Sequence, residues 1–494
     1  MTSTESLDTL EEIISLLSKT IKGDNELIYQ ILFNGLSAFT KKPTHLMIME
    51  KSSEGKTYPA LEIAKHFPKE NTITLGSATP QSFKYEHGIE VDENYNPIQS
   101  KGPNQNTKTL VDLRNKWIIF KEPPDHKLIE ALFSTLSSDE EFNEHKFVNN
   151  PNGTNKTFTV VIRGTPAVLV CSAKDETRNS RWDEIKTRFN VISPVSSSTK
   201  YRDGMDLVGK SKGLPKSIYE KFVISKDEKA RISFLIAKLI EHIKYHENEI
   251  LNPFITEMSK HYPQEAGFRW REYARFMDIV KLHCLCYLQE RPKVITKDEI
   301  FSIVTLSDIK FGLSLMKDNV NIPPNKLNWF RDIFYECWKE KGIDVNFYGN
   351  TRKCIIGQDL KNFIAEKKLG NNTVKQIRET YLDTLFEHGL IEKESDPRNK
   401  TREVYWPVED AEKLKDSSLI VTTSLDESCV NSFLDGYQLR RLTYKIFNKT
   451  ISEEQLIQYI LSTKNVISYD DFVFKKDNDS MTINEELVGG ENSE

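Results

Sequence analysis

A group of residues able to bind phosphate follows the first apolar run of the chain. The segment from Glu50 to Thr57 reads EKSSEGKT and ends in Gly55, Lys56 and Thr57. It matches the phosphate-loop pattern GxxxxGK[ST] at its last three positions, whereas Glu50 replaces the first glycine. In such a loop, backbone N–H groups surround the phosphate oxygens, the lysine reaches the β- and γ-phosphates, and the threonine hydroxyl binds Mg²⁺. These residues predict a site for ATP and Mg²⁺ with Thr57 as the metal ligand.

A carboxylate suited to activate water follows another apolar run, WIIF, at residues 117–120. Phosphate-loop ATPases place two acidic groups at such a strand end, one that positions Mg²⁺ and one that polarises the attacking water. Glu122 stands at the second position and is the candidate catalytic base. Lys121 stands at the first, so Mg²⁺ is expected to depend on Thr57 and water. The same residues also fit an ordinary strand end followed by a turn.

The elements that must position these residues alternate between strands and helices. Apolar runs at residues 45–49, 116–120 and 166–173 indicate buried strands, and amphipathic helical runs follow them. This alternation over residues 41–200 predicts an α/β core with a mainly parallel sheet.

Two stretches between these runs predict hairpins. Residues 142–164 form two β-prone arms around the tip NNPNGTNK, which contains Lys156. Residues 88–109 are rich in Asn, Pro, Gly and Lys and indicate a hairpin or a mobile loop.

The remaining segments flank the 41–200 core. Three-to-four spacing of apolar residues predicts helices in residues 1–40 and a helical lid and connector over residues 201–345. Residues 346–410 read as helix, turn, helix and a short hairpin, which is typical of a winged helix. The last segment, 411–494, is predicted to hold a helical part and an acidic, disordered tail.

The order of these parts resembles the AAA+ ATPases, in particular the branch of minichromosome-maintenance and superfamily 3 viral helicases. The resemblance covers about residues 40–290 and comprises a phosphate loop, an acidic strand end, a hairpin, a strand with a polar end and a helix that ends in Arg-Phe. It implies that Ser172 is the sensor 1 residue and that Lys156 contacts DNA in a central channel.

The same resemblance assigns roles to three arginines. Arg188, in IKTRFNVISP, is implied to be an arginine finger that enters the site of a neighbouring subunit. A homo-oligomer, such as a hexameric ring, would follow from that role. The segment FRWREYARF is similar to the lid helix that carries the sensor 2 arginine, and its spacing does not decide between Arg269 and Arg271.

The winged-helix segment supplies further candidates for DNA contact. Lys375 and Arg378 lie three residues apart on the second helix and can face one groove. Arg398, Lys400 and Arg402 lie in the hairpin, where they can meet phosphates. Acidic residues are nearly as numerous as basic ones in this segment, so a protein–protein contact is an alternative.

Composition narrows the setting of the protein. The net charge of −5 gives no general basic signal, so any nucleic-acid contact must be local. The start of the chain lacks a basic region followed by an apolar run, and no stretch reaches the roughly 20 apolar residues of a membrane span. The six scattered cysteines fit reduced thiols. We expect a cytoplasmic protein without a membrane partner.

Three hypotheses of function follow. The first is an ATP-hydrolysing, helicase-like DNA motor in replication. The second is an ATP-switched replication initiator or transcription regulator with little hydrolysis, which accounts for Glu50 and Lys121 more easily. The third is a nucleotide-dependent assembly protein that uses its winged helix to bind partners.

Overall fold

The structure is a computed structural model of the 494-residue chain. The residues that it describes are 9–50, 55–76, 88–98, 108–124, 141–149, 156–172, 188–194, 198–262, 269–316, 329–347, 350–367, 373–387, 390–408 and 425–463. Four sheets form within these ranges.

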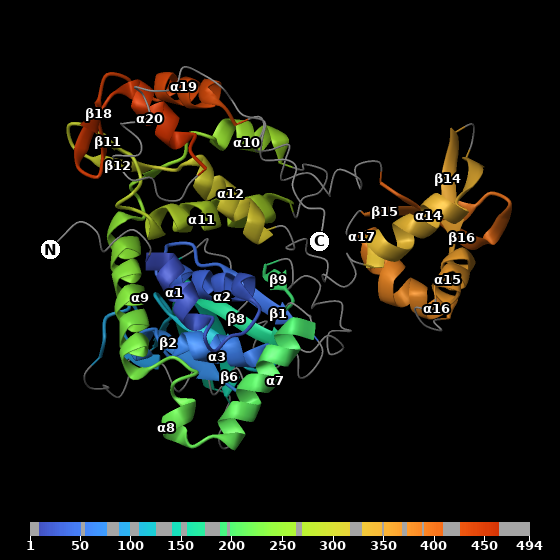
Figure 1. The fold of residues 1–494 in the computed structure, drawn as a ribbon, viewed down its shortest axis with the longest axis horizontal. Helices are drawn as coiled ribbons and strands as arrows, with labels where there is room; N and C mark the ends of the chain where they lie inside the picture. Colours follow the sequence, from blue (N-terminus) through green and yellow to red (C-terminus); the bar gives the residue numbers. More distant parts are fainter. Residues whose placement is uncertain are drawn as a thin grey trace.

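Sheet A is the parallel sheet that carries the predicted phosphate loop. Its strands are β1 (His45–Met49), β2 (Thr72–Leu75), β5 (Trp117–Phe120), β8 (Ala167–Ser172) and β9 (Asn190–Ile192). They lie in the order β2-β5-β8-β1-β9, and every neighbouring pair is parallel (Figure 1). The predicted α/β architecture with a parallel sheet is therefore confirmed.

Both faces of sheet A are covered, which explains why its strands are continuous apolar runs. Leu46 and Ile48 point into a core that the strands share with helices. Met47 and Met49 point to the opposite face and pack with residues of a second sheet, such as Val160. Side chains of a strand alternate in this way because successive residues face opposite sides.

The helical face of sheet A is built largely from the N-terminal part of the chain. The helices that share this core include α1 (Thr9–Leu17), α2 (Asn25–Ser37), α3 (Thr57–Ala64), α9 (Lys226–His246) and α11 (Arg269–Cys286). In α2, the buried Asn34 amide donates to the Thr44 carbonyl at 2.7 Å and accepts from the Trp117 indole at 2.8 Å. Residues 9–37 are therefore part of the core around sheet A.

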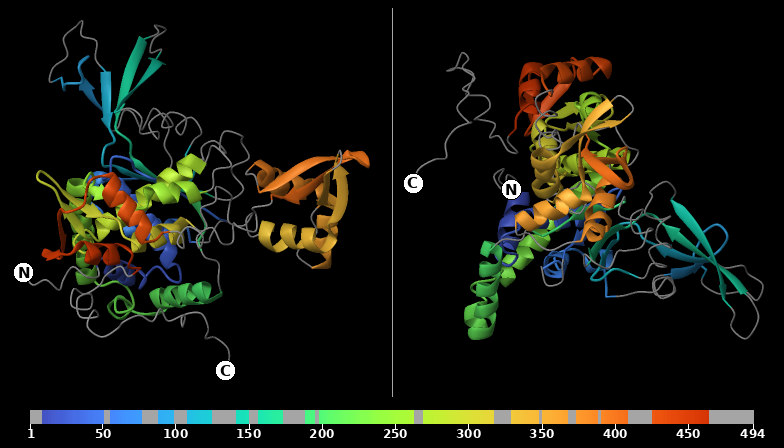
Figure 2. Two further views of the ribbon diagram at one scale, coloured as in Figure 1. Left: turned by 90° about the horizontal axis from the view of Figure 1, so that it is seen from above. Right: turned by 90° about the vertical axis from the view of Figure 1, so that its right-hand side faces the viewer.

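The arm sheet covers the other face and projects from it (Figure 2). Its strands are β3 (Gly88–Val91), β4 (Lys108–Asp112), β6 (Phe142–Asn149) and β7 (Lys156–Arg163), in the order β3-β4-β7-β6. The pair β6 and β7 is the predicted hairpin, and β3 pairs antiparallel with β4. Parallel pairing of β4 with β7 joins the two hairpins into one sheet.

After sheet A the chain continues through α7 (Ser198–Gly213), the short α8 (Lys216–Tyr219) and α9 into a lid unit. The lid unit contains α10 (Ile255–His261), α11, α12 (Leu306–Met316), β10 (Ile250–Leu251), β11 (Lys293–Ile295) and β12 (Ile300–Ile303). The C-terminal elements complete it: α19 (Glu427–Gly436), β17 (Thr443–Ile446), β18 (Lys449–Ile451) and α20 (Glu453–Ile460). Its sheet has the order β10-β12-β11-β17-β18, so residues distant in sequence share one core.

A fully buried ion network fixes α11 against α12. Asp308, at the start of α12, accepts from the Arg291 guanidinium at 2.6 Å and lies 2.5 Å from the His283 ring. All three side chains are inaccessible to solvent. The positive guanidinium offsets burial and lowers the pKa of Asp308 to about 2, so this carboxylate stays charged at neutral pH.

The inserted unit lies between the two halves of the lid unit in sequence. Its helical segments are η3 (Phe330–Tyr335), α14 (Glu336–Lys341), α15 (Gly357–Glu366), α16 (Val374–Ile377), η4 (Arg378–Leu382) and α17 (Asp383–Glu387). Its strands are β13 (Ile343–Phe347), β14 (Asn350–Ile356), β15 (Ile391–Asp396) and β16 (Asn399–Pro407). The core of this unit begins at Trp329, so the expected boundary at residue 346 falls inside it.

Candidate functional site

The order of strands in sheet A makes its carboxyl edge a candidate binding site. From β1 the chain runs to β2 at one border of the sheet, and from β8 it crosses to β9 on the other side of β1. The strand order therefore reverses at β1, and ligands of open parallel sheets bind at the carboxyl ends of strands at such a point. The segment that starts at Glu50 leaves β1 at this place.

The described ends of the phosphate loop have the geometry that such a loop needs. Gly55 has a φ of +77°, which favours glycine because a Cβ atom crowds the backbone there. The Glu50 N–H donates to the Ser172 carbonyl at 3.4 Å, which ties the loop to β8. The Lys56 ammonium donates to the Glu50 carbonyl and so lies across the base of the loop. Residues 51–54 lie outside the described residues.

Helix α3 presents its N-terminus to this edge. Ala60 and Ile63 are buried against the sheet, and α3 also packs on α2. Thr57 is the first residue of the helix and is half-buried. The N-terminal N–H groups and positive dipole end of α3 therefore face the space beyond β1, which suits an anion such as a phosphate.

The strand register brings Glu122 and Ser172 to the level of the loop. Ser172 pairs with Met49, the last residue of β1. On the other side of β8, Phe120 pairs with Val170, so Glu122, two residues further, stands level with Ser172. Glu122 is exposed, whereas Ser172 is completely buried.

Alternation along β8 assigns Ser172 and Cys171 to different faces of sheet A. Ser172 follows Cys171, so it points to the arm-sheet side. Cys171 points to the helical side with α3. The neighbour of Cys171 in the continued register is Lys121.

Cys171 contacts the phosphate loop, and sequence reasoning missed it. Its Sγ lies 3.8 Å from the Lys56 carbonyl oxygen. Burial raises the pKa of this thiol to about 11, and a hydrogen bond with Thr57 offsets only part of that rise, so it stays protonated at neutral pH. Ser193, after β9, was also missed; its hydroxyl donates to the Met49 carbonyl at 2.6 Å. The sequence signal that could have placed Cys171 beside the loop was its position in the apolar run at residues 166–173, where alternate residues face opposite sides of the sheet.

Arg188 lies at the opposite edge of the same sheet. It stands two residues before Asn190, which pairs with Leu46 near the start of β1. At about 3.3 Å per residue, Arg188 is roughly 15 Å from the carboxyl end of β1. The structure therefore does not bring Arg188 to the phosphate loop of its own chain.

Helix α11 carries the two predicted lid arginines near its start and a third, buried arginine further along. Arg271 is exposed near the start of α11, and the side chain of Arg269 lies outside the described residues. The buried arginine of this helix is Arg275, which is 8% exposed and donates to the Phe189 carbonyl at 2.7 Å. This contact, which sequence reasoning missed, fixes α11 to the segment beside Arg188.

The hairpin residue Lys156 is the first residue of β7 and pairs with Asn149. The tip at 150–155 and the Lys156 side chain lie outside the described residues. On the neighbouring arm, Lys146 of β6 is exposed.

Most of the predicted DNA-binding cations of the inserted unit are paired with carboxylates. Arg398 and Arg402 both bind the buried Asp396, at 2.9 and 2.6 Å. Their guanidinium groups hold the pKa of Asp396 far below its usual range. Lys375 lies 3.7 Å from Glu379.

The other two predicted DNA-binding cations of the inserted unit are Arg378 and Lys400. Arg378 lies 3.5 Å from Glu403 and 3.8 Å from Asp383. Lys400 belongs to β16, and its side chain lies outside the described residues. The paired cations would have to exchange carboxylates for phosphates in order to bind DNA.

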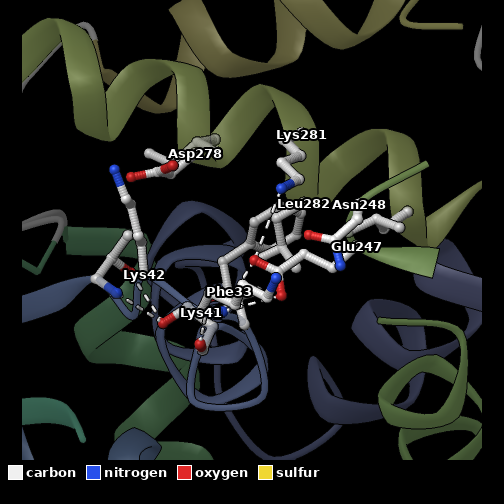
Figure 3. A pocket seen from close by; sticks show the side chains of 13 residues that line it. Phe33, Lys41, Lys42, Glu247, Asn248, Asp278, Lys281 and Leu282 are labelled. Atoms are coloured by element: carbon white, nitrogen blue, oxygen red, sulfur yellow. Dashed lines mark hydrogen bonds and ion pairs between the residues drawn. The ribbon is translucent and has the colours of Figure 1, made fainter. Parts of the chain in front are cut away.

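A cavity with a charged lining lies away from the predicted phosphate loop. It has a volume of about 140 Å³ and opens beside the segment that leads into β1, at the amino edge of sheet A. Glu247 accepts from the Lys41 backbone N–H at 2.8 Å, and the Lys42 side chain extends toward Asp278 (Figure 3). Burial raises the pKa of Asp278 to about 6. Its acids face lysines, as in the pair of Glu247 with Lys281 at 3.6 Å.

No group of three or more His, Cys, Asp or Glu side chains suited to a metal occurs among the described residues. Mg²⁺ is usually held by one or two carboxylates together with substrate phosphates. On the face of Thr57, the strand-end residue is Lys121, whose charge opposes a cation.

Every helix in the described ranges is too short or too polar to span a bilayer. The chain matches no protein-family model, and no curated protein matches it significantly.

Proposed function

We propose that this chain is an ATP-binding protein with an AAA+-type core that hydrolyses ATP to move along DNA, as a helicase-like motor. The observation that supports this most is the gathering of Gly55, Lys56, Thr57 and Glu122 at one edge of a parallel sheet, at the reversal of its strand order. Separation of the loop strand from the acidic strand by one further strand, β8, agrees with the AAA+ resemblance.

In this proposal each residue has a defined task. The N–H groups of Gly55, Lys56 and Thr57 bind the phosphates, and the Lys56 ammonium leaves the Glu50 carbonyl for the β- and γ-phosphates. Glu122 is exposed at the same level and accepts a proton from the water that attacks the γ-phosphate.

Arg188 supports an oligomeric form of the proposal. Because Arg188 lies at the opposite edge of sheet A from the loop of its own chain, the proposal has it act at the loop of a neighbouring copy. A ring of identical subunits, with the β6–β7 hairpins directed to a central channel, satisfies this geometry. Stabilisation of the transferring phosphoryl group by such an arginine is a large part of catalysis in related chemistry.

The test is ATP turnover with and without single-stranded and duplex DNA. Glu122→Gln is expected to lower DNA-stimulated turnover by about 10²- to 10⁴-fold, the usual contribution of a general base, while ATP binding persists. Glu70→Gln, an exposed glutamate near the amino end of β2, is the matched control and should keep full turnover. Turnover that DNA leaves unchanged would reject the motor.

The contribution of the hairpin is tested separately. Lys156→Ala should reduce stimulation by DNA, and Lys146→Ala, on the other arm of the same hairpin, is the control. Equal stimulation in both variants would remove the hairpin from the proposal.

A second function is favoured by Lys121 and by the ion pairs of the inserted unit. A cation at the metal position slows hydrolysis, and a winged helix whose basic residues are paired suits a regulated contact. In that case the chain is an ATP-switched initiator or regulator. It would bind ATP and protect a DNA site in footprinting, but it would not turn ATP over.

A further inference from the structure

We propose that the cavity beside the segment that leads into β1 binds a small aliphatic amino acid, with Asp278 as the partner of its ammonium group and Lys42 as the partner of its carboxylate. The cavity lies at the amino edge of sheet A, away from the predicted phosphate loop. The proposal therefore goes beyond the nucleotide-dependent function and does not depend on it.

The cavity is formed by two parts of the molecule. Phe33 of α2 and Lys42, which precedes β1, belong to the core around sheet A, whereas Asp278 and Leu282 belong to helix α11. The cavity has a volume of about 140 Å³. An apolar cavity of roughly 150 Å³ can hold benzene, so there is room for about six non-hydrogen atoms. A ligand of this size would contact the core and the lid unit at once.

Much of the cavity wall is apolar. Four buried side chains supply this surface: Phe33, Ile279, Leu282 and Leu285. The Ser37 hydroxyl also lines the cavity, but it already donates to the Asn34 carbonyl at 2.7 Å. Small-molecule sites typically combine such an apolar wall with a few polar groups that orient the ligand. The wall therefore suits a branched aliphatic side chain.

One of the two carboxylates of the cavity is already paired within the protein. Glu247 accepts from the Lys41 N–H at 2.8 Å and lies 3.6 Å from the Lys281 ammonium. Figure 3 shows Lys281 reaching toward Glu247 in this way. Glu247 and Lys281 therefore satisfy each other without a ligand.

Asp278 is the carboxylate that lacks such a partner. Within the part of the chain that the structure describes, it accepts no hydrogen bond and forms no ion pair within 4 Å, and Lys42 and Lys281 act on it only at longer range. Burial raises the pKa of Asp278 to about 6, because the charged form is poorly solvated. A buried charge is costly unless it is paired, so an ammonium group beside Asp278 would offset this cost.

Charge balance favours a ligand that carries both signs. The lining holds three cations and two carboxylates: Lys41, Lys42, Lys281, Glu247 and Asp278. A simple amine would add to the excess of positive charge, and a simple carboxylate would leave Asp278 without a partner. An amino acid provides an ammonium for Asp278 and a carboxylate for a lysine. Lys42 suits the latter role, because it is exposed and extends toward Asp278 (Figure 3).

The experiment measures the Kd for leucine with the full chain by isothermal titration calorimetry at neutral pH. Two analogues test the two charges separately, since 3-methylbutylamine lacks the carboxylate and 4-methylpentanoate lacks the ammonium group. Leucine is expected to bind saturably. Each analogue should bind about 10- to 100-fold more weakly, the effect of losing one hydrogen bond to a charged group.

Two substitutions locate the site. Asp278→Asn and Lys42→Met should each weaken leucine binding by about 10- to 100-fold. Asp278→Asn removes a poorly solvated charge and is not expected to impair folding. It should leave the affinity for 4-methylpentanoate unchanged, because this analogue has no ammonium group.

Asp298→Asn and Lys310→Met are the matched controls. Both residues are exposed, belong to the lid unit and do not line the cavity. The two control variants should bind leucine as the wild type does.

Three results would overturn the proposal or one of its parts. Absence of leucine binding by the wild type at millimolar concentration would reject the site. Unchanged leucine affinity in Asp278→Asn would reject Asp278 as the partner of the ammonium group. Equal affinity of the wild type for leucine and 3-methylbutylamine would reject the role of Lys42.

Discussion

Replacement of Gly55 by alanine isolates the backbone geometry of the phosphate loop. A Cβ atom added at Gly55 would meet no atom of the described residues within 4 Å, apart from its chain neighbours. Among these residues, the obstacle to the new side chain is the φ of +77°. A non-glycine residue in the left-handed region costs about 1–2 kcal/mol.

This cost must appear in the complex with ATP, because phosphate binding requires the left-handed backbone. If the free loop of the variant relaxes to an ordinary conformation, the strain reappears when ATP binds, and the Kd for ATP rises by about 5- to 30-fold. If the free loop stays strained, the free energy of unfolding falls by the same 1–2 kcal/mol instead. The sum of the two effects is fixed by the geometry.

The assay combines ATP titration with urea unfolding of Gly55→Ala. Gly209→Ala is the matched control, since Gly209 also has open space around its Cβ position but lies in helix α7 without a positive φ. It should stabilise the helix by about 0.5–1 kcal/mol and leave ATP binding unchanged. Wild-type ATP affinity together with wild-type stability in Gly55→Ala would refute the loop geometry.

Two further predictions concern buried carboxylates of the lid and the cavity. Asp308→Asn should lower the free energy of unfolding by about 3–5 kcal/mol in urea, because the buried Arg291 loses the counter-charge that Asp308 provides. A loss below about 1 kcal/mol would argue against the network. In the wild type, the depressed pKa of Asp308 implies stability that is present above pH 4 and lost as the pH falls toward 2. Asp278 has a raised pKa of about 6, so wild-type stability should fall as the pH rises from 4 to 6. The free energy of unfolding of Asp278→Asn should therefore exceed that of the wild type by about 1–2 kcal/mol at pH 7 and by little at pH 4. A difference that stays constant between pH 4 and pH 7 would contradict the raised pKa of Asp278.

The strands of sheet A were predictable because each is buried on both faces. The runs at 45–49, 116–120 and 166–173 contain little but apolar residues, and they became β1, β5 and β8 with shifts of one residue at most. The 142–164 hairpin was predictable from its β-prone arms and Asn-Gly-rich tip, and it became β6 and β7. The three-residue β9 was missed because so short a strand has no periodicity.

Contacts between distant segments were not predictable. Parallel pairing of β4 with β7 and the return of β17 to β11 depend on tertiary packing, which leaves no local pattern. The sequence also gave no sign that Asp396 would bind Arg398 and Arg402, since opposite charges close in sequence do not determine which of them pair.

Only part of the candidate site could be predicted from the sequence, because the rest depends on contacts between distant segments. Residues that follow apolar strands, such as Glu50 and Glu122, could be placed at one sheet edge from the alternation of elements alone. Their assignment to faces required the register, which showed that Cys171 and Lys121 lie on the side of α3, whereas Ser172 does not.

The most direct test of the central claim is an ATP titration of the wild type, Lys56→Ala and Lys65→Ala by calorimetry. Lys56 and Lys65 flank helix α3 at its two ends, so the second variant controls for loss of a lysine on this helix. A phosphate-binding edge predicts saturable binding by the wild type and by Lys65→Ala, with affinity about 10- to 100-fold weaker in Lys56→Ala. Absence of binding by the wild type, or equal affinity in all three proteins, would contradict it.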